Sequence, residues 1–193
     1  MSSSPTVLVD MDGVMADFVG LTSTHLRQNH PDIPVVEHTA FYYREDYPDP
    51  AHQKIISQIH CSQFFFRDMP PVKGALEGWQ RIKELGYHPV ICTAPLRANP
   101  WCQPEKLQWV EYYLGPEAAH EAVVDKHKES HDGIALIDDR PVLKNAHDAT
   151  WQHVVFDTSY NQDSPSSLRL NGWDDPNLET ILAECARIYR SNL

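Results

Sequence analysis

The sequence has no long apolar run, no paired-cysteine motif and few basic residues, and each absence argues against a class of protein. No apolar stretch approaches the ~18–20 residues that a membrane-spanning helix needs. The four cysteines form no CxxC pair and no dense framework, so we expect reduced thiols in a cytoplasmic protein. Residues 1–5 have neither a basic region nor a long apolar stretch, so we expect no secretory signal there.

Acidic residues outnumber basic ones by a wide margin. Lys and Arg total 16, Asp and Glu total 27, and the formal net charge is −11. Such a chain repels polyanions at long range, which argues against a nucleic-acid polymer or an anionic membrane as partner. A small anion can still bind where local cations or a metal ion overcome this field. The 193 residues, of which 41% are hydrophobic, suffice for a single folded core with one addition.

Short β-branched runs alternate with helix-like segments along most of the chain. The runs 7–9, 90–93, 122–124, 134–137 and 154–156 each have the character of a buried strand. The segments 74–85, 105–114 and 176–189 carry apolar residues at helical spacing. This alternation predicts βαβ units and an α/β fold, with a parallel sheet covered by helices on both faces. The Pro- and Ser-rich residues 157–167 are expected to form a surface loop.

Residues 17–72 break this rhythm. They contain no clear buried strand, but helix-like stretches occur near 21–29 and 51–59. We expect a small, mostly helical cap here, inserted between the core segments 1–16 and 73–193 at the C-terminal edge of the sheet. The cap is rich in aromatic side chains, which either line a ligand site or form the core of the cap itself: Phe41, Tyr42, Tyr43, Tyr47, Phe64, Phe65 and Phe66.

Two carboxylates, Asp10 and Asp12, directly follow the first predicted strand. Side chains at i and i+2 of an extended chain point the same way, and Gly13 permits a sharp turn or the close approach of a ligand. The pair suits a nucleophile and an acid/base held together by a hard cation. The other interpretation is a strand-terminal turn with Asp as a capping residue.

Three further polar groups follow later predicted strands. Thr93 ends one strand, and its hydroxyl could hold a phosphate oxygen. Asp138 and Asp139 end another, where two adjacent carboxylates are costly without a cation unless they form a solvated turn. The candidates to neutralise a phosphate are Lys126, Lys128 and Lys106, although an isolated lysine is usually a solvated surface charge.

The order of these elements resembles that of the haloacid dehalogenase (HAD) superfamily. More narrowly, residues 6–157 resemble the 5′(3′)-deoxyribonucleotidase family, with a looser match in the C-terminal helix. The runs that carry this resemblance are 9–18, 64–66, 91–96, 105–116 and 136–141. It implies a HAD-like Rossmannoid sheet with a cap after the first strand, and a cytoplasmic, Mg²⁺-dependent hydrolase of deoxyribonucleoside monophosphates such as dUMP and dTMP. A homodimer, a phosphatase for another small phosphate ester and a non-catalytic phosphate-binding module stay open.

The resemblance also implies roles for the carboxylates. Asp10 would be the nucleophile that forms an aspartyl-phosphate, and Asp12 would act as general acid and then as general base. Mg²⁺ would be held by the Asp10 carboxylate, the Asp12 backbone carbonyl and Asp139. Asp138 would be an outer or alternate ligand.

Substrate contacts follow from the same resemblance. Thr93 and Lys126 would bind the phosphate, with Lys128 as a rival because the spacing from Lys126 to Asp138 is two residues longer than in the family. Ala94 and Lys106 also match phosphate-site positions. The nucleoside pocket would be lined by Phe18, Phe41, Tyr43 and Phe65, whose apolar wall favours deoxyribose. Three positions depart from the family pattern: Ala94 replaces Ser in animal members, while Tyr42 and Ile59 each replace Trp.

Overall fold

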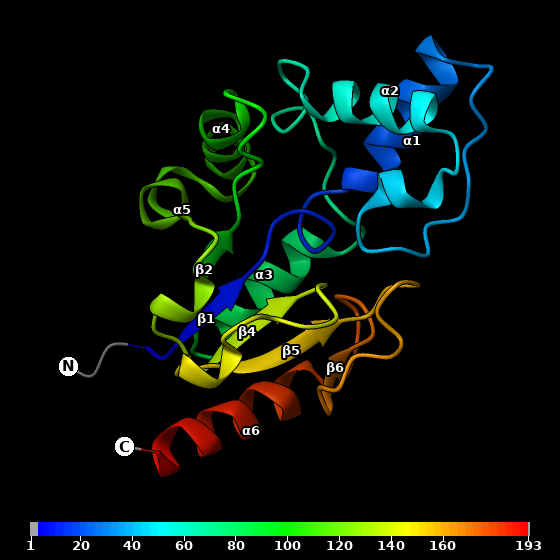
Figure 1. The fold of residues 1–193 in the computed structure, drawn as a ribbon. Helices are drawn as coiled ribbons and strands as arrows, with labels where there is room; N and C mark the ends of the chain where they lie inside the picture. The colour runs from blue at the N-terminus through cyan, green and yellow to red at the C-terminus, as the bar shows by residue number, and fades with distance from the viewer. Residues whose placement is uncertain (1–3, 193) are drawn as a thin grey trace.

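A six-stranded parallel sheet forms the centre of the computed structural model, which describes residues 4–192 (Figure 1). The strands are β1 (Thr6–Val9), β2 (His88–Thr93), β3 (Val123–Val124), β4 (Ala135–Asp138), β5 (Gln152–Phe156) and β6 (Leu168–Leu170). Their order is β3-β2-β1-β4-β5-β6, and every neighbouring pair is parallel. The predicted α/β class is confirmed. The short strand β6 was not predicted, because its three residues include the charged Arg169 and follow a Pro- and Ser-rich segment.

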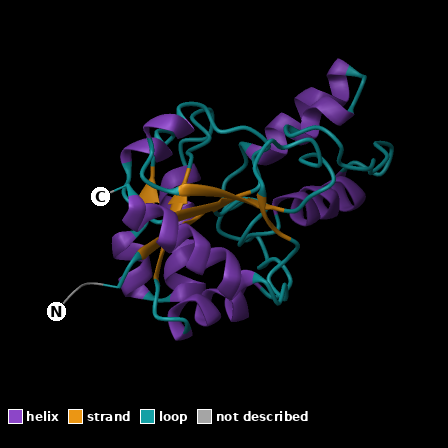
Figure 2. Ribbon diagram, turned by 90° about the horizontal axis from the view of Figure 1, so that it is seen from below, coloured by secondary structure: helices purple, strands orange, loops and turns teal. Residues whose placement is uncertain are grey.

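Helices flank this sheet (Figure 2). The α-helices outside residues 17–72 are α3 (Ala75–Glu84), α4 (Cys102–Leu114), α5 (Pro116–Glu121) and α6 (Leu178–Ser191), the last of which follows β6. Two short 3₁₀ helices are η2 (Lys128–Ser130) and η3 (Ala146–Asp148). Helix α4 begins earlier than predicted, because Pro104 lies in its first turn, where a proline loses no hydrogen bond. Helix α5 is too short for a periodic signal.

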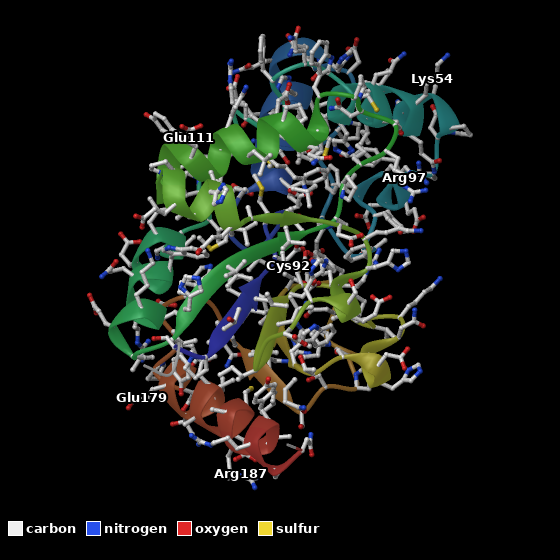
Figure 3. The ribbon with its side chains drawn as sticks, turned by 90° about the vertical axis from the view of Figure 1, so that its left-hand side faces the viewer. Lys54, Cys92, Arg97, Glu111, Glu179 and Arg187 are labelled. Carbon is white, nitrogen blue, oxygen red and sulfur yellow. The ribbon has the colours of Figure 1, made fainter. Side chains whose placement is uncertain are left out.

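The central strand β1 is buried on both faces because it alternates between two apolar clusters. Val7 and Val9 belong to the larger cluster, whereas Leu8 packs in a smaller one with Cys92, Leu136 and Trp151. Cys92 lies in the interior of the molecule, while charged side chains such as Arg187 lie at its periphery (Figure 3). Residues on β1 therefore have fixed positions, and so does the chain segment that leaves its carboxyl end.

Residues 17–72, the expected cap, leave and re-enter the rest of the chain at one place. The Asp17 amide donates to the Pro70 carbonyl, and the Val72 amide donates to the Met15 carbonyl, each at 2.8 Å. Between them the cap contains α1 (Phe18–Asn29), η1 (Tyr43–Asp46) and α2 (Pro50–His60), with α1 and α2 packed together beyond the ends of the strands (Figure 1). None of the described helices is long and apolar enough to cross a membrane.

Candidate active site

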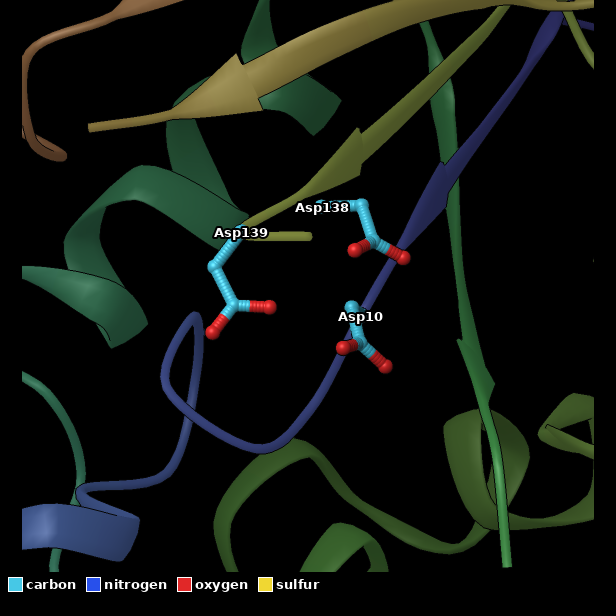
Figure 4. A group of neighbouring side chains, drawn as sticks. All are labelled: Asp10, Asp138 and Asp139. Carbon is cyan, nitrogen blue, oxygen red and sulfur yellow. The ribbon is translucent and has the colours of Figure 1, made fainter. Parts of the chain in front are cut away.

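Three buried carboxylates meet at the carboxyl edge of the sheet (Figure 4). Asp10 follows β1, Asp138 ends β4, and Asp139 is the next residue. Because β1 and β4 are adjacent and parallel, with Val9 opposite Ile137, their carboxyl ends lie side by side. One oxygen from each carboxylate lies within 4.8 Å of the others. The topology therefore brings together groups more than a hundred residues apart in sequence.

Lys128 is the cation buried among these groups. Its Nζ lies 2.8 Å from Asp10 Oδ1 and donates to Asp138 Oδ2 at 2.5 Å. The lysine begins η2, and the Trp151 indole donates to its carbonyl at 3.1 Å. Burial alone would lower the pKa of Lys128, but Asp10 and Asp138 outweigh burial and raise it. Lys128 therefore remains charged in the site.

A single lysine does not balance three carboxylates. Burial tends to raise the pKa of Asp138, but Lys128 and the hydrogen bonds from Lys128 and the Arg140 amide lower it overall. By contrast, burial and the neighbouring carboxylates hold the pKa of Asp139 well above its usual value. Burial also raises the pKa of Asp10, despite the attraction of Lys128. The single charge of Lys128 is thus too small to balance the three carboxylates when all are ionised.

Lys106 connects a second group of polar residues, which follows β1 and β2 at the same edge of the sheet. Its Nζ donates to Asp12 Oδ2 at 2.8 Å, to Thr93 Oγ1 at 2.8 Å and to the Ala94 carbonyl at 3.0 Å. The side chain is only 1% exposed, and all three ammonium donors are used. Asp12 Oδ1, in contrast, is buried and has no hydrogen-bond partner among residues 4–192.

Gly13 allows the Asp10–Asp12 segment to turn against Asp139. Its φ of +78° favours glycine, and a Cβ at this position would lie 2.5 Å from Asp139 Oδ2. The Tyr160 hydroxyl donates to the same oxygen, and the Asn161 amide donates to the Asp139 carbonyl at 2.8 Å. Tyr160 and Asn161 were not predicted from sequence, because nothing in the 157–167 segment distinguishes them from loop residues.

The donor set fits a divalent cation. Four carboxylates, Asp10, Asp12, Asp138 and Asp139, face two ammonium groups, Lys106 and Lys128, so ionisation of all four carboxylates leaves two negative charges uncompensated. Asp10 Oδ1 is buried, and Lys128 Nζ lies 2.8 Å from it. Hard oxygen donors of this kind are the ligands that Mg²⁺ prefers.

The structure does not bring Lys126 to the site. Its side chain is exposed, whereas Lys128 is buried between Asp10 and Asp138. The expectation for Lys126 is therefore corrected in favour of its rival, Lys128. The reason is local: after β3 the Asp125 carboxylate accepts a hydrogen bond from the His127 amide, and the chain then turns into η2 with Lys128 inward.

The aromatic residues expected around a nucleoside separate into two groups. The rings of Phe18 and Phe65 are in edge contact, with centroids 5.2 Å apart, and Phe65 contacts Phe66, whose ring lies 5.2 Å from Lys106 Nζ. Phe41 lies instead beside Arg140, whose Cζ is 4.6 Å from the ring centroid.

Three further aromatic or apolar residues between 17 and 72 differ in whether they are buried or exposed. Tyr43 is 3% exposed and shares a hydrogen bond with the Tyr47 hydroxyl, so it belongs to the core of the cap. Ile59 is buried in the same apolar cluster, whereas Tyr42 is exposed and accepts a hydrogen bond from Arg140. Of these two departures from the family pattern, only Tyr42 is available to a ligand.

Sequence comparison finds close relatives along nearly the whole chain. Residues 4–186 match the family described as 5′ nucleotidase, deoxy (pyrimidine), cytosolic type C. A Bordetella bronchiseptica protein named as a candidate 5′(3′)-deoxyribonucleotidase is 38% identical over 96% of this chain and 98% of its own length. The human cytosolic-type 5′(3′)-deoxyribonucleotidase is 34% identical over 91% of this chain and 92% of its own length.

Solved structures share the fold at much lower identity. A protein from Clostridium acetobutylicum named as a candidate phosphatase aligns with a TM-score of 0.59 at 15% identity, covering 95% of this chain and 100% of that one. A Bacillus subtilis protein named as a candidate HAD hydrolase and bound to magnesium aligns with a TM-score of 0.58 at 11% identity, covering 94% of this chain and 99% of that one. Taken with the buried aspartates at the sheet edge, these matches place the chain in the 5′(3′)-deoxyribonucleotidase family, whose members are phosphoric monoester hydrolases of the HAD superfamily.

Proposed function

We propose that the protein is a Mg²⁺-dependent deoxyribonucleotidase that hydrolyses pyrimidine deoxyribonucleoside monophosphates, such as dUMP and dTMP, through an aspartyl-phosphate. The observation that carries the proposal is the buried cluster of Asp10, Asp138 and Asp139 around Lys128. The substrate class rests on the names of the family and of the human relative. In this proposal residues 17–72 form the cap, and residues 1–16 and 73–193 form the catalytic core.

Asp10 and Asp12 divide the chemistry. A carboxylate oxygen of Asp10 attacks phosphorus, the bond from phosphorus to the ester oxygen breaks, and Asp12 gives its proton to the departing nucleoside oxygen. Water then attacks the phosphorus of the aspartyl-phosphate and gives a proton to Asp12. The bond from phosphorus to the Asp10 oxygen breaks, which regenerates the Asp10 carboxylate and releases inorganic phosphate. Asp12 Oδ1, which has no hydrogen-bond partner in the described part of the chain, is the oxygen suited to carry this proton.

The remaining residues hold charge and position. Asp10, Asp139 and the Asp12 backbone carbonyl would bind Mg²⁺, which when bound neutralises the charge that opposes the meeting of a carboxylate and a phosphate. Lys128 and the Thr93 hydroxyl bind phosphate oxygens. Lys106 fixes the positions of Asp12 and Thr93 relative to each other through its three hydrogen bonds.

A substrate panel with and without Mg²⁺ tests the reaction. We expect Mg²⁺-dependent release of phosphate from dUMP and dTMP, and slower release from UMP and sugar phosphates. Acid quenching during turnover of ³²P-labelled dUMP should trap labelled protein in the wild type and none in Asp10→Asn. Turnover of dUMP in the presence of excess chelator would contradict the metal requirement, and labelling of Asp10→Asn would contradict the nucleophile.

Phe18 distinguishes a nucleotidase from a general phosphatase. Its ring lies at the start of α1, against the ring of Phe65. Phe18→Ala should lower kcat/KM for dUMP by about ten- to a hundredfold, because the contacts of one ring contribute roughly 1–3 kcal/mol. The kcat/KM for p-nitrophenyl phosphate, which has no nucleoside, should stay nearly unchanged. Equal losses on both substrates would remove the case for a nucleoside pocket at Phe18.

A further inference from the structure

Two consecutive residues of the loop between β5 and β6 hold Asp139 from two sides. The Tyr160 hydroxyl donates to Asp139 Oδ2. The Asn161 side-chain amide donates at 2.8 Å to the Asp139 carbonyl and at 2.8 Å to the Phe156 carbonyl. The loop therefore fixes both the backbone and the side chain of this carboxylate.

The loop is itself braced from β6. Asn161 is completely buried, and its Oδ1 accepts from the Thr158 amide at 3.1 Å and from Arg169 Nη1 at 2.9 Å. Arg169 also pairs with Asp157 at 2.6 Å and donates to the Asn161 carbonyl at 2.9 Å. Since the polar atoms of the Asn161 side chain all have partners within the protein, the position of Tyr160 next to it does not depend on a bound ligand.

The hydroxyl of Tyr160 leaves the other oxygen of Asp139 available. In Figure 4 one oxygen of Asp139 points toward Asp10 and Asp138, and the other points away from them. Gly13 packs closely against Asp139 Oδ2 and the Tyr160 hydroxyl, since a Cβ there would lie 2.5 Å and 3.3 Å from them. Rotation of the carboxylate is thus restricted by a hydrogen bond and by the backbone of the Asp10–Gly13 turn.

The ring of Tyr160 contacts the cap. Its centroid lies 4.4 Å from that of His38 and 6.0 Å from that of Phe41. The neighbouring Ser159 hydroxyl donates to the His38 carbonyl, and His38 Nδ1 lies 2.8 Å from Asp46 Oδ2. One side chain therefore joins a carboxylate of the core to the cap segment that precedes Phe41.

We propose that Tyr160 is a positioning residue for the catalytic cation, acting through Asp139, and that its ring independently supports the cap. The proposal rests on the proposed function, because it takes Asp139 as a metal ligand. Groups that orient a metal-binding side chain through a hydrogen bond change metal affinity by about 10- to 100-fold when removed. Tyr160→Phe removes the hydroxyl and keeps the ring, so it separates the two roles.

Isothermal titration of the metal-free protein with Mg²⁺ is the test. Tyr160→Phe should raise the Kd for Mg²⁺ by about tenfold, with KM for dUMP nearly unchanged because the ring remains. Raising the Mg²⁺ concentration about tenfold should restore kcat, since the only expected defect of the variant is its weaker binding of the ion. Tyr47→Phe is the matched control, because it removes another buried tyrosine hydroxyl, one that is hydrogen-bonded to Tyr43 within the cap. It should leave the Kd for Mg²⁺ unchanged.

Asp139→Asn separates failure of this proposal from failure of the proposed function. If Asp139→Asn loses Mg²⁺ binding while Tyr160→Phe binds like the wild type, Tyr160 does not position the ion and the present inference is wrong. An equal loss in Tyr47→Phe would also overturn it, because the effect would then be a general loss of packing. If Asp139→Asn itself binds Mg²⁺ normally, the metal assignment in the proposed function fails.

Discussion

Asp10 is the residue on which the proposed covalent chemistry depends. Asp10→Asn is isosteric and should fold, but an amide cannot form the aspartyl-phosphate, so kcat should fall by at least ~10³-fold. Steady-state kinetics on dUMP, together with circular dichroism to verify folding, measure this. Activity within tenfold of the wild type, equivalent to about 1.4 kcal/mol, would contradict the mechanism.

Lys128 and Lys126 offer a matched pair, because they are two residues apart and only Lys128 is buried in the cluster. Lys128→Gln leaves Asp10 and Asp138 without their ammonium partner. Breaking a buried ion pair costs about 3–5 kcal/mol, so both urea stability and activity should drop strongly. Lys126→Gln should change kcat/KM by less than twofold and should leave the free energy of unfolding nearly unchanged. Comparable losses in the two variants would refute the assignment of Lys128.

At the scale of elements, His60 at the end of α2 makes the cap sensitive to acid. The Thr22 hydroxyl donates to the Phe18 carbonyl, so its oxygen accepts from His60 Nε2 at 3.1 Å, and the ring of His60 packs on Phe18. Burial, reinforced by the charges of Arg44 and His25, lowers the pKa of His60 to about 3. The unfolded chain binds this proton below pH 6.5 and the folded chain does not.

Stability from this group is therefore present above pH 6.5 and is lost as pH falls toward 3, at about 1.4 kcal/mol for each pH unit. Between pH 7 and pH 5 the wild type should lose about 2 kcal/mol more than His60→Gln, whose amide can still reach Thr22. Urea unfolding of both proteins at the two pH values gives this difference, and the other titrating groups cancel. Equal losses would show that His60 is not buried as a neutral ring.

Secondary structure was predictable where a signal repeated along the chain. The β-branched run ending at Asp10 and the apolar run ending at Asp138 gave the two central strands, and hence the meeting of their carboxylates. Lys128 could not be chosen over Lys126 from spacing, because the choice depends on the tight turn of η2. The role of Tyr160 could not be predicted from sequence, because its partner Asp139 lies 21 residues away and only the conformation of the β5–β6 loop brings the two together. Contacts of this kind come from tertiary structure and leave no local period.

At the scale of the whole molecule, folding assembles a site with too much negative charge. Four carboxylates against two lysines should destabilise the metal-free protein, so millimolar Mg²⁺ should raise its melting temperature. At a concentration of about 100 times Kd the gain is about 2.7 kcal/mol, or roughly 5–10 °C for a domain of this size. Differential scanning fluorimetry in NaCl of matched ionic strength measures it. Asp139→Asn should respond less, and an equal response would exclude Asp139 as a ligand.

The paired backbone contacts at Asp17–Pro70 and Val72–Met15 have an evolutionary consequence. A segment whose two ends meet at one point can be replaced by a longer or shorter one without altering the register of the sheet. The described groups that carry charge in the reaction all lie outside that segment, so new substrate ranges can arise by exchange of the cap while the hydrolytic residues are inherited unchanged. The contact between Tyr160 and His38 limits this modularity, because an exchanged cap must also supply a surface for that ring.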